Sequence, residues 1–220
     1  MTNGFFSVPK VTCEKVKSYS PGSKERKEAQ KEYEKMISKV VQLPMVINGK
    51  KIKTNNKKNI YPPHDHKHIV GQCYYANESH VKKAIEAASN AKEKWSEMPW
   101  EQRCSIFLKA ADLLSGPYRQ KINIATMINQ SKNIFQAEID AACELIDFLK
   151  FNVKFLTEIY QKQPESSNGI WNRMEYRPLE GFIYAITPFN FTSIAANLCL
   201  APALMGNTVV WKPSDSQTYS

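Results

Sequence analysis

Residues 181–220 decide the fold; their sequence is GFIYAITPFNFTSIAANLCLAPALMGNTVVWKPSDSQTYS. The first part, residues 181–186, is short and apolar, which is typical of a strand covered on both faces in a parallel sheet. Apolar residues then recur at helical spacing at Ile194, Leu198, Ala201 and Leu204 or Met205. The pair Gly206-Asn207 marks a helix end, and residues 208–211 are strand-like again. The stretch therefore predicts a βαβ unit with a right-handed crossover.

The turn after the first predicted strand is Thr187-Pro188-Phe189-Asn190. A dinucleotide-binding turn usually carries Gly-x-Gly-x-x-Gly, so that backbone amides can approach a pyrophosphate. This turn has no glycine, and we do not expect a standard phosphate cradle. Asn190 falls at the carboxyl edge of the predicted sheet, where open α/β sheets bind ligands. Its amide nitrogen could donate to a developing oxyanion, or its side-chain oxygen could cap the following helix.

Lys212 ends the second predicted strand, at the place where Rossmann-like proteins commonly contact the adenosine ribose. Asp215 lies three residues further on and could accept hydrogen bonds from hydroxyls or cap the next helix. A lone lysine would be weak evidence for a cofactor site. Its position one βαβ unit after Asn190 makes it a candidate.

The amino-acid composition limits which classes of protein are possible. With 220 residues and 42% hydrophobic content, the chain can bury a sizeable core in one or two domains. The net charge of +9 raises the question of nucleic acid, but the lysines alternate with glutamates on predicted helices and no basic-aromatic motif accompanies them. We therefore expect a solvated basic face and no nucleic-acid partner. No apolar run is long enough to span a bilayer, so we expect no membrane span.

Neither the cysteines nor the histidines form a recognisable metal motif. The five cysteines contain no CxxC pair, which suits reduced thiols in an intracellular compartment. His64, His66 and His68 would share one face of an extended strand about 7 Å apart, too far for one ion without a turn. We expect no metal site. The N-terminus lacks the apolar core of a signal peptide, and it leaves a mitochondrial transit peptide open.

Four segments precede the predicted helical region. A charged helix is expected over residues 24–41, and Asn48-Gly49 predicts a hairpin in which residues 45–47 pair with residues 51–53. A lysine-rich loop over residues 55–59 and a strand over residues 69–75 follow.

Helices are then expected from Asn77, from Pro99, over residues 118–129 and over residues 134–160. In the second of these, the residues expected to face inward are Ile106, Phe107, Ala110, Leu113 and Leu114. Residues 171–177 look like an edge strand. We divide the chain into an arm with a surface helix (1–43), a hairpin and strand segment (44–76), and an incomplete NAD-binding domain (77–220).

Residues 181–216 resemble the aldehyde dehydrogenase superfamily, in which a Pro-aromatic-Asn-Phe turn precedes a helix with Ala-Pro-Ala or Gly-Pro-Ala and a strand that ends in Lys. The segments FLKAADLLSGPYR and QAEIDAACELIDFLKFN resemble its Δ1-pyrroline-5-carboxylate dehydrogenase branch. The resemblance covers nearly the whole chain from about Ser20. It implies an α/β fold, the N-terminal part of the aldehyde dehydrogenase fold, with helices and the first βαβ unit of a Rossmann-like NAD-binding sheet. The implied parent activity is oxidation of L-glutamate γ-semialdehyde to L-glutamate with NAD in proline breakdown.

The resemblance also implies roles for individual residues. Asn190 matches the asparagine that stabilises the oxyanion, and Lys212 matches the lysine that binds the NAD ribose. The turn residues Thr187, Pro188 and Phe189 fall on the cofactor side. The two residues that match the aldehyde tunnel are Glu144, at its mouth, and Phe191, in its lining. From the residues alone, Glu144 could equally be an exposed helix carboxylate and Phe191 a core aromatic.

Other parts of the family pattern are missing from these residues. The nucleophilic Cys of a Gly-Gln-Lys-Cys-Ser segment, the general-base Glu and a Phe-Thr-Gly-Ser cofactor loop do not occur. Cys199 lies on the apolar crossover helix, where we expect it to be packed, so it cannot replace the nucleophile. We therefore expect the chain to be inactive alone, with a non-catalytic partner of full-length subunits as the alternative. The resemblance implies homo-oligomers in the mitochondrial matrix, with the cytoplasm as the alternative compartment.

Overall fold

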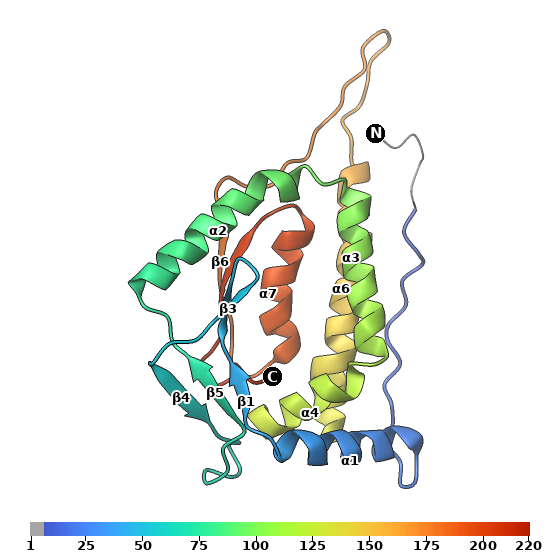
Figure 1. Cartoon of the computed structure of the whole chain (residues 1–220). Helices are drawn as coiled ribbons and strands as arrows, with labels where there is room; N and C mark the ends of the chain where they lie inside the picture. Colours follow the sequence, from blue (N-terminus) through green and yellow to red (C-terminus); the bar gives the residue numbers. More distant parts are fainter. Residues whose placement is uncertain (1–6) are drawn as a thin grey trace.

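The computed structural model describes residues 7–220, in which helices dominate. The α-helices are α1 (Lys24–Ile37), α2 (Glu78–Ser96), α3 (Trp100–Ser115), α4 (Arg119–Gln130), α5 (Ile134–Ala137), α6 (Glu144–Gln161) and α7 (Thr192–Leu204). A π-helical segment, η1 (Glu138–Cys143), joins α5 to α6 without a break. Helices α3 and α6 run side by side, with α7 packed beside α6, while α1 and α4 lie across one end (Figure 1).

The strands form three small sheets. They are β1 (Val41–Leu43), β2 (Met45–Ile47), β3 (Lys50–Ile52), β4 (Lys57–Ile60), β5 (Gly71–Tyr74), β6 (Ile183–Ile186) and β7 (Val209–Lys212). Strand β5 lies between β1, which is parallel to it, and β4, which is antiparallel. Strands β2 and β3 make the predicted hairpin, whose turn residues Asn48 and Gly49 both have positive φ, as a type I′ turn requires.

The predicted βαβ unit is confirmed. Strands β6 and β7 pair in parallel from Ile183 opposite Val209 to Ile186 opposite Lys212, and α7 connects them. Helix α7 gives way to Gly206 at φ +92°, a backbone conformation that glycine adopts without strain. The expected cover on both faces of the first strand is not present among the described residues, because Tyr184 and Ile186 are 57% and 63% exposed.

Two apolar cores hold the elements together. The first includes residues of α1, α4 and β5 together with Tyr19 of the segment before α1, residues 7–23, which we call the N-terminal arm. The second lies between α3, α6 and α7, and includes Phe107, Leu149 and Leu204. Helix α4 contributes to both cores, and η1 contacts α4, α6 and α7.

Several expected boundaries were wrong. Helix α1 ends at Ile37, and Val41 already belongs to β1. The expected lysine-rich loop contains β4, whose residues pair with β5, and the hairpin ladder places Val46 opposite Lys51, one residue earlier than expected. Residues 171–177 form no strand; they belong to a long excursion between α6 and β6 (Figure 1).

Two of the residues expected to face inward on α3 do not. Ile106 is 48% exposed and Leu113 is 38% exposed, whereas Phe107 is buried. Helical spacing placed all five on one broad stripe, but the buried face of α3, which includes Cys104, Phe107 and Ala111, is shifted to one side of that stripe and leaves Ile106 and Leu113 at its exposed edge.

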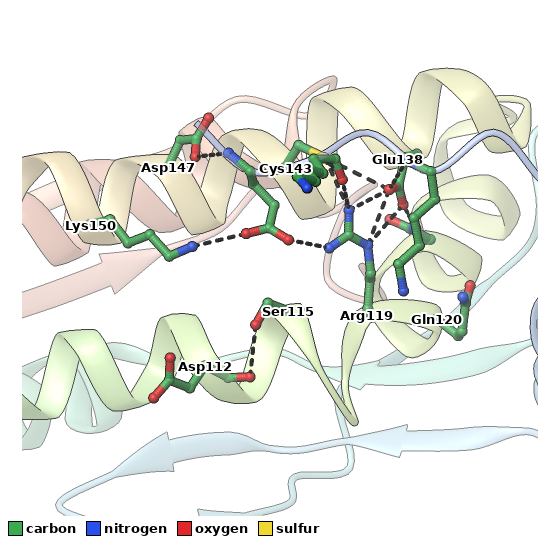
Figure 2. A network of polar contacts seen from close by, with 12 residues as sticks. Asp112, Ser115, Arg119, Gln120, Glu138, Cys143, Asp147 and Lys150 are labelled. Carbon is green, nitrogen blue, oxygen red and sulfur yellow. Dashed lines mark hydrogen bonds and ion pairs between the residues drawn. The ribbon is translucent and has the colours of Figure 1, made fainter. Parts of the chain in front are cut away.

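A buried ion pair between Arg119 of α4 and Glu138 of η1 ties the helices to the N-terminal arm (Figure 2). Arg119 also donates from Nη1 to Glu14 Oε1 over 2.7 Å and from Nη2 to the main-chain oxygen of Lys15 over 2.7 Å. Glu138 accepts further hydrogen bonds from the amide of Lys17 and from the hydroxyl of Tyr19. The arm is therefore pinned to the same π-helical segment that leads into α6.

Candidate functional site

The turn between β6 and α7 begins with a residue fixed against the neighbouring strand. The Thr187 amide donates to the Lys212 oxygen over 3.3 Å, which places the carboxyl ends of β6 and β7 side by side. The indole Nε1 of Trp211 donates to Thr187 Oγ1 over 3.0 Å, and Thr187 is 5% exposed. Its hydroxyl accepts this hydrogen bond and keeps its own proton to donate, at the end of the sheet where open α/β proteins bind ligands.

Gln217 contacts the same turn and is 3% exposed. Its amide fits its neighbours when the nitrogen faces the Pro188 and Phe189 carbonyls and the oxygen faces the protein donors. In that orientation the oxygen accepts from the Thr192 amide over 3.1 Å and from Gln130 Nε2 over 2.8 Å. A side chain thus occupies the first amide of α7, which agrees with the expectation that this helix start is not a phosphate cradle.

Asn190 is exposed at the tip of the turn, and only its main chain is tied down. The N-cap position of α7 belongs to Phe191, which makes no side-chain cap bond, so the alternative in which Asn190 caps the helix was wrong. Within residues 7–220 no hydrogen bond engages the Asn190 side chain. Its amide group is available to a ligand at the sheet edge.

Lys132 reaches this turn from the segment after α4. Its Nζ donates to the main-chain oxygen of Asn190 over 2.7 Å and to Asp140 Oδ2 over 2.9 Å. It also lies 4.1 Å from the centre of the Phe191 ring, well within cation–π range. Phe191 is half-buried, so the structure places it at the turn rather than in either core.

Glu144 begins α6 and faces α7, where its Oε2 accepts a hydrogen bond from the Ser193 hydroxyl. It lines a cavity of about 640 Å³ whose walls are mostly apolar. Phe148 and Phe151 of α6 and Val16 of the arm contribute to those walls. The carboxylate is therefore half-buried and fixed, unlike an exposed helix carboxylate.

Lys212 stands at the end of β7 with a carboxylate beside it. Its Nζ lies 3.3 Å from Asp215 Oδ1, and both side chains are about half exposed. The hydroxyl of Tyr75 donates to Asp215 Oδ2 over 3.3 Å. Burial, and next the charge of Asp215, raise the pKa of Tyr75 to about 12, so this hydroxyl remains a donor near neutral pH. Lys212 and Asp215 together could hydrogen-bond to the hydroxyls of a ribose: the carboxylate accepts and the ammonium donates.

Three of the four buried cysteines, those of α3, η1 and α7, are not activated nucleophiles. Cys199 is 8% exposed on α7, which confirms the expected packing. Burial raises the pKa of Cys104 and Cys199 to about 11 and that of Cys143 to about 12, and the carboxylate of Glu138 adds to the effect at Cys143. A thiol is nucleophilic only as a thiolate, so these three side chains are inert near neutral pH.

The three closely spaced histidines do not converge. His64 Nδ1 lies 2.8 Å from the Ser131 hydroxyl, whereas His68 Nε2 lies 2.7 Å from the Ile37 oxygen. In the part of the chain that the structure describes, no three histidine, cysteine or carboxylate side chains are placed to hold one metal ion.

The structure thus brings Asn190, Phe191 and Glu144 to the start of α7, and Thr187 and Lys212 to one edge of the β6–β7 pair. It places Pro188 half-buried and Phe189 exposed on the turn between these groups. Sequence reasoning missed Lys132 and Gln217. Nothing in their own neighbourhoods distinguishes them, because both act across distances in sequence that only the fold closes.

A parallel βαβ unit with an exposed asparagine at its first turn is the arrangement of open α/β proteins, which commonly bind ligands at the carboxyl ends of their strands. The model of the aldehyde dehydrogenase family matches residues 51–220, and the chain belongs to that family. It is 50% identical over 217 residues to a probable delta-1-pyrroline-5-carboxylate dehydrogenase of Schizosaccharomyces pombe, across 98% of this chain and 40% of that protein.

Two further comparisons agree. A mitochondrial delta-1-pyrroline-5-carboxylate dehydrogenase of Dictyostelium discoideum is 42% identical across 97% of this chain and 38% of its own length. The crystal structure of the Mycobacterium tuberculosis delta-pyrroline-5-carboxylate dehydrogenase bound with NAD matches with a TM-score of 0.97 at 49% identity. That match covers 99% of this chain and 41% of the other.

The chain therefore spans about two fifths of the length of the relatives it matches. Among the helices of the described residues, none combines the length and the apolar character that crossing a bilayer would need.

Proposed function

We propose that this chain supplies the oxyanion donor, part of the NAD site and part of the aldehyde passage of an enzyme that oxidises L-glutamate γ-semialdehyde to L-glutamate. The proposal rests chiefly on the environment of Asn190. Its main chain is fixed by Lys132, its side chain is unengaged by residues 7–220, and the turn that holds it has no glycine cradle for a phosphate. The names of the relatives support the choice of substrate.

Asn190 would act on charge that develops during the reaction. A carbonyl oxygen gains negative charge when a nucleophile adds to an aldehyde, and a preorganised amide donor stabilises that charge. Such a donor is typically worth about 3 kcal/mol of barrier height, because it needs no reorganisation at the moment of reaction. Lys132 fixes the main-chain oxygen of Asn190, which restricts where its side-chain amide can lie.

The residues at the sheet edge fit an NAD ribose. Lys212 and Asp215 offer a donor and an acceptor about half exposed to solvent, and Thr187 offers a hydroxyl held by Trp211. NAD, when bound, accepts the hydride that the aldehyde oxidation releases. In this proposal Thr187, Pro188 and Phe189 contact the cofactor, and Lys212 binds its adenosine ribose.

Glu144 and Phe191 would line the passage of the aldehyde. Ser193 fixes the Glu144 carboxylate, and Lys132 fixes the Phe191 ring, so both groups keep their orientation without substrate. L-Glutamate γ-semialdehyde carries an ammonium group as well as a carboxylate, and a half-buried carboxylate such as Glu144 favours a cation near it.

We expect the remaining catalytic groups of the enzyme to lie outside these 220 residues. The cysteines buried in α3, η1 and α7 stay protonated, and we expect the nucleophile and the general base elsewhere in the polypeptide. The chain alone should then bind NAD weakly and turn over no aldehyde. We further propose the mitochondrial matrix as its compartment, by analogy with relatives named mitochondrial, and a homo-oligomer as its assembly.

The test has two measurements on purified protein. The complete polypeptide that carries this sequence should form NADH from NAD and L-glutamate γ-semialdehyde, while the 220-residue chain should not. Absence of NADH formation by the complete, folded polypeptide would contradict the proposed activity. Turnover by the 220-residue chain would contradict the expectation that its catalytic groups are incomplete.

A further inference from the structure

Lys132 is the point at which three elements meet near the proposed oxyanion donor. It follows Ser131, the residue after α4, which ends that helix with a left-handed φ of +53°. The ammonium contacts the Asn190 oxygen, the Asp140 carboxylate of η1 and the face of the Phe191 ring. Its side chain is 15% exposed, so these contacts are largely shielded from water.

We propose that Lys132 is a positioning residue for catalysis: it holds the main chain of Asn190 and the ring of Phe191 in their working orientation. This inference rests on the proposed function. Lys132 itself is not expected to touch substrate. An ammonium has three donors, and two hydrogen bonds with one ring face account for its directions.

The geometry favours positioning over simple stabilisation. The turn lies at the surface, with Phe189 at 64% exposure and Asn190 exposed, so local packing does little to fix its outer half. Gln217 holds the inner half, at the Pro188 and Phe189 carbonyls. Lys132 fixes the next carbonyl, that of Asn190, the residue whose side chain is the proposed donor. A shift of about 1 Å in a reacting group can lower a rate by about a hundredfold.

Asp140 contributes to this arrangement because its carboxylate is the second hydrogen-bond partner of the Lys132 ammonium. Asp140 is 26% exposed, so loss of Lys132 leaves a carboxylate that water can solvate rather than an isolated buried charge. Removal of Lys132 should therefore disturb the turn far more than the overall fold. Removal of Asp140 should disturb the same turn through Lys132.

The experiment compares Lys132→Met with the control Lys121→Met in the complete polypeptide. Lys121 also lies over an aromatic ring, that of Tyr118, but it is exposed on α4 and contacts no site residue. We expect Lys132→Met to lower kcat about tenfold to a hundredfold with little change in KM for NAD, and Lys121→Met to leave both unchanged. Asp140→Ala should lower kcat as well, and the double variant should be no slower than Lys132→Met.

A second measurement does not depend on activity. Amide hydrogen exchange over residues 188–193 should be faster in the Lys132→Met form of the 220-residue chain than in the unsubstituted chain, with exchange in α3 and α6 unchanged. Equal exchange in the turn, or losses in kcat that simply add in the double variant, would overturn the role of Lys132. An inactive unsubstituted enzyme whose turn still loosens in Lys132→Met would count against the proposed function, while showing that Lys132 does hold the turn.

Discussion

Nε of Arg119 donates to Oε1 of Glu138 over 3.1 Å, and both side chains are almost completely buried. This pair joins α4 to the π-helical segment, and through Glu14, Lys15 and Lys17 it fixes the N-terminal arm. The arm in turn forms part of the wall of the cavity that Glu144 lines. The ion pair therefore supports the proposed aldehyde passage from behind.

Arg119→Met should destabilise the fold by about 3–5 kcal/mol, because it leaves the Glu138 carboxylate buried without its cation. Urea unfolding followed by circular dichroism measures the change. Arg173→Met is a suitable control, since the pair that Arg173 makes with Glu175 is largely exposed. A loss in Arg119→Met no larger than that of the control would show that the network contributes little.

Stability should fall on acidification below about pH 4.5. Burial opposes the charged forms of Glu14 and Glu138, but hydrogen bonds from Lys150 and Arg119 at Glu14, and from Arg119 and the Lys17 amide at Glu138, lower the pKa of each below the ordinary 4.5. Both groups therefore stabilise the fold above that pH, and their contribution is lost as pH falls through their folded-state pKa values. Asp147 acts in the opposite sense, because burial raises its pKa.

The variant Glu14→Gln isolates part of this effect. It keeps a hydrogen-bond acceptor beside Arg119 and removes the titrating group. Urea midpoints measured between about pH 3 and pH 6 should depend less steeply on pH in Glu14→Gln than in the unsubstituted chain. Curves of equal slope would mean that other carboxylates dominate the acid response.

The sequence was sufficient to predict the βαβ unit, the Asn48-Gly49 hairpin and the start of α2 at Asn77. Each depends on neighbours in sequence, such as a cap, a turn pair or an apolar period. The strand expected over residues 171–177 was wrong because strand-like residues do not by themselves supply a pairing partner. Strand β4 was missed because its lysines resemble a loop, although lysine is common on exposed edge strands.

The residues of the candidate site also divide into those that local sequence predicts and those that only the fold reveals. Asn190 and Lys212 could be proposed from the sequence because one lies in the turn after a strand of a recognisable unit and the other ends a strand of that unit. The contacts that hold them were not predictable: Gln217 bonds to a turn that precedes it by nearly thirty residues, and Lys132 bonds to Asn190 across 58 residues. The Arg119–Glu138 pair was not predictable either, because its residues lie on different helical segments, α4 and the π-helical η1, and only the fold buries them together.

Lys212→Ala should weaken NAD binding about tenfold, since a charge-assisted hydrogen bond to a ribose is worth about 1.5 kcal/mol or more. Calorimetric titration of the complete polypeptide with NAD measures the change. Lys121→Ala, an exposed lysine on α4, is the matched control. If Lys212→Ala binds NAD as tightly as this control, Lys212 is not a ribose ligand.

The central claim, that Asn190 is the oxyanion donor, is tested most directly by kcat of Asn190→Ala in the complete polypeptide with NAD and L-glutamate γ-semialdehyde. The side chain makes no hydrogen bond within residues 7–220, so the substitution should leave the unfolding midpoint unchanged. We predict a fall in kcat of about a hundredfold to a thousandfold. A kcat within about threefold of the unsubstituted enzyme, in a protein that is folded and binds NAD normally, would contradict the account.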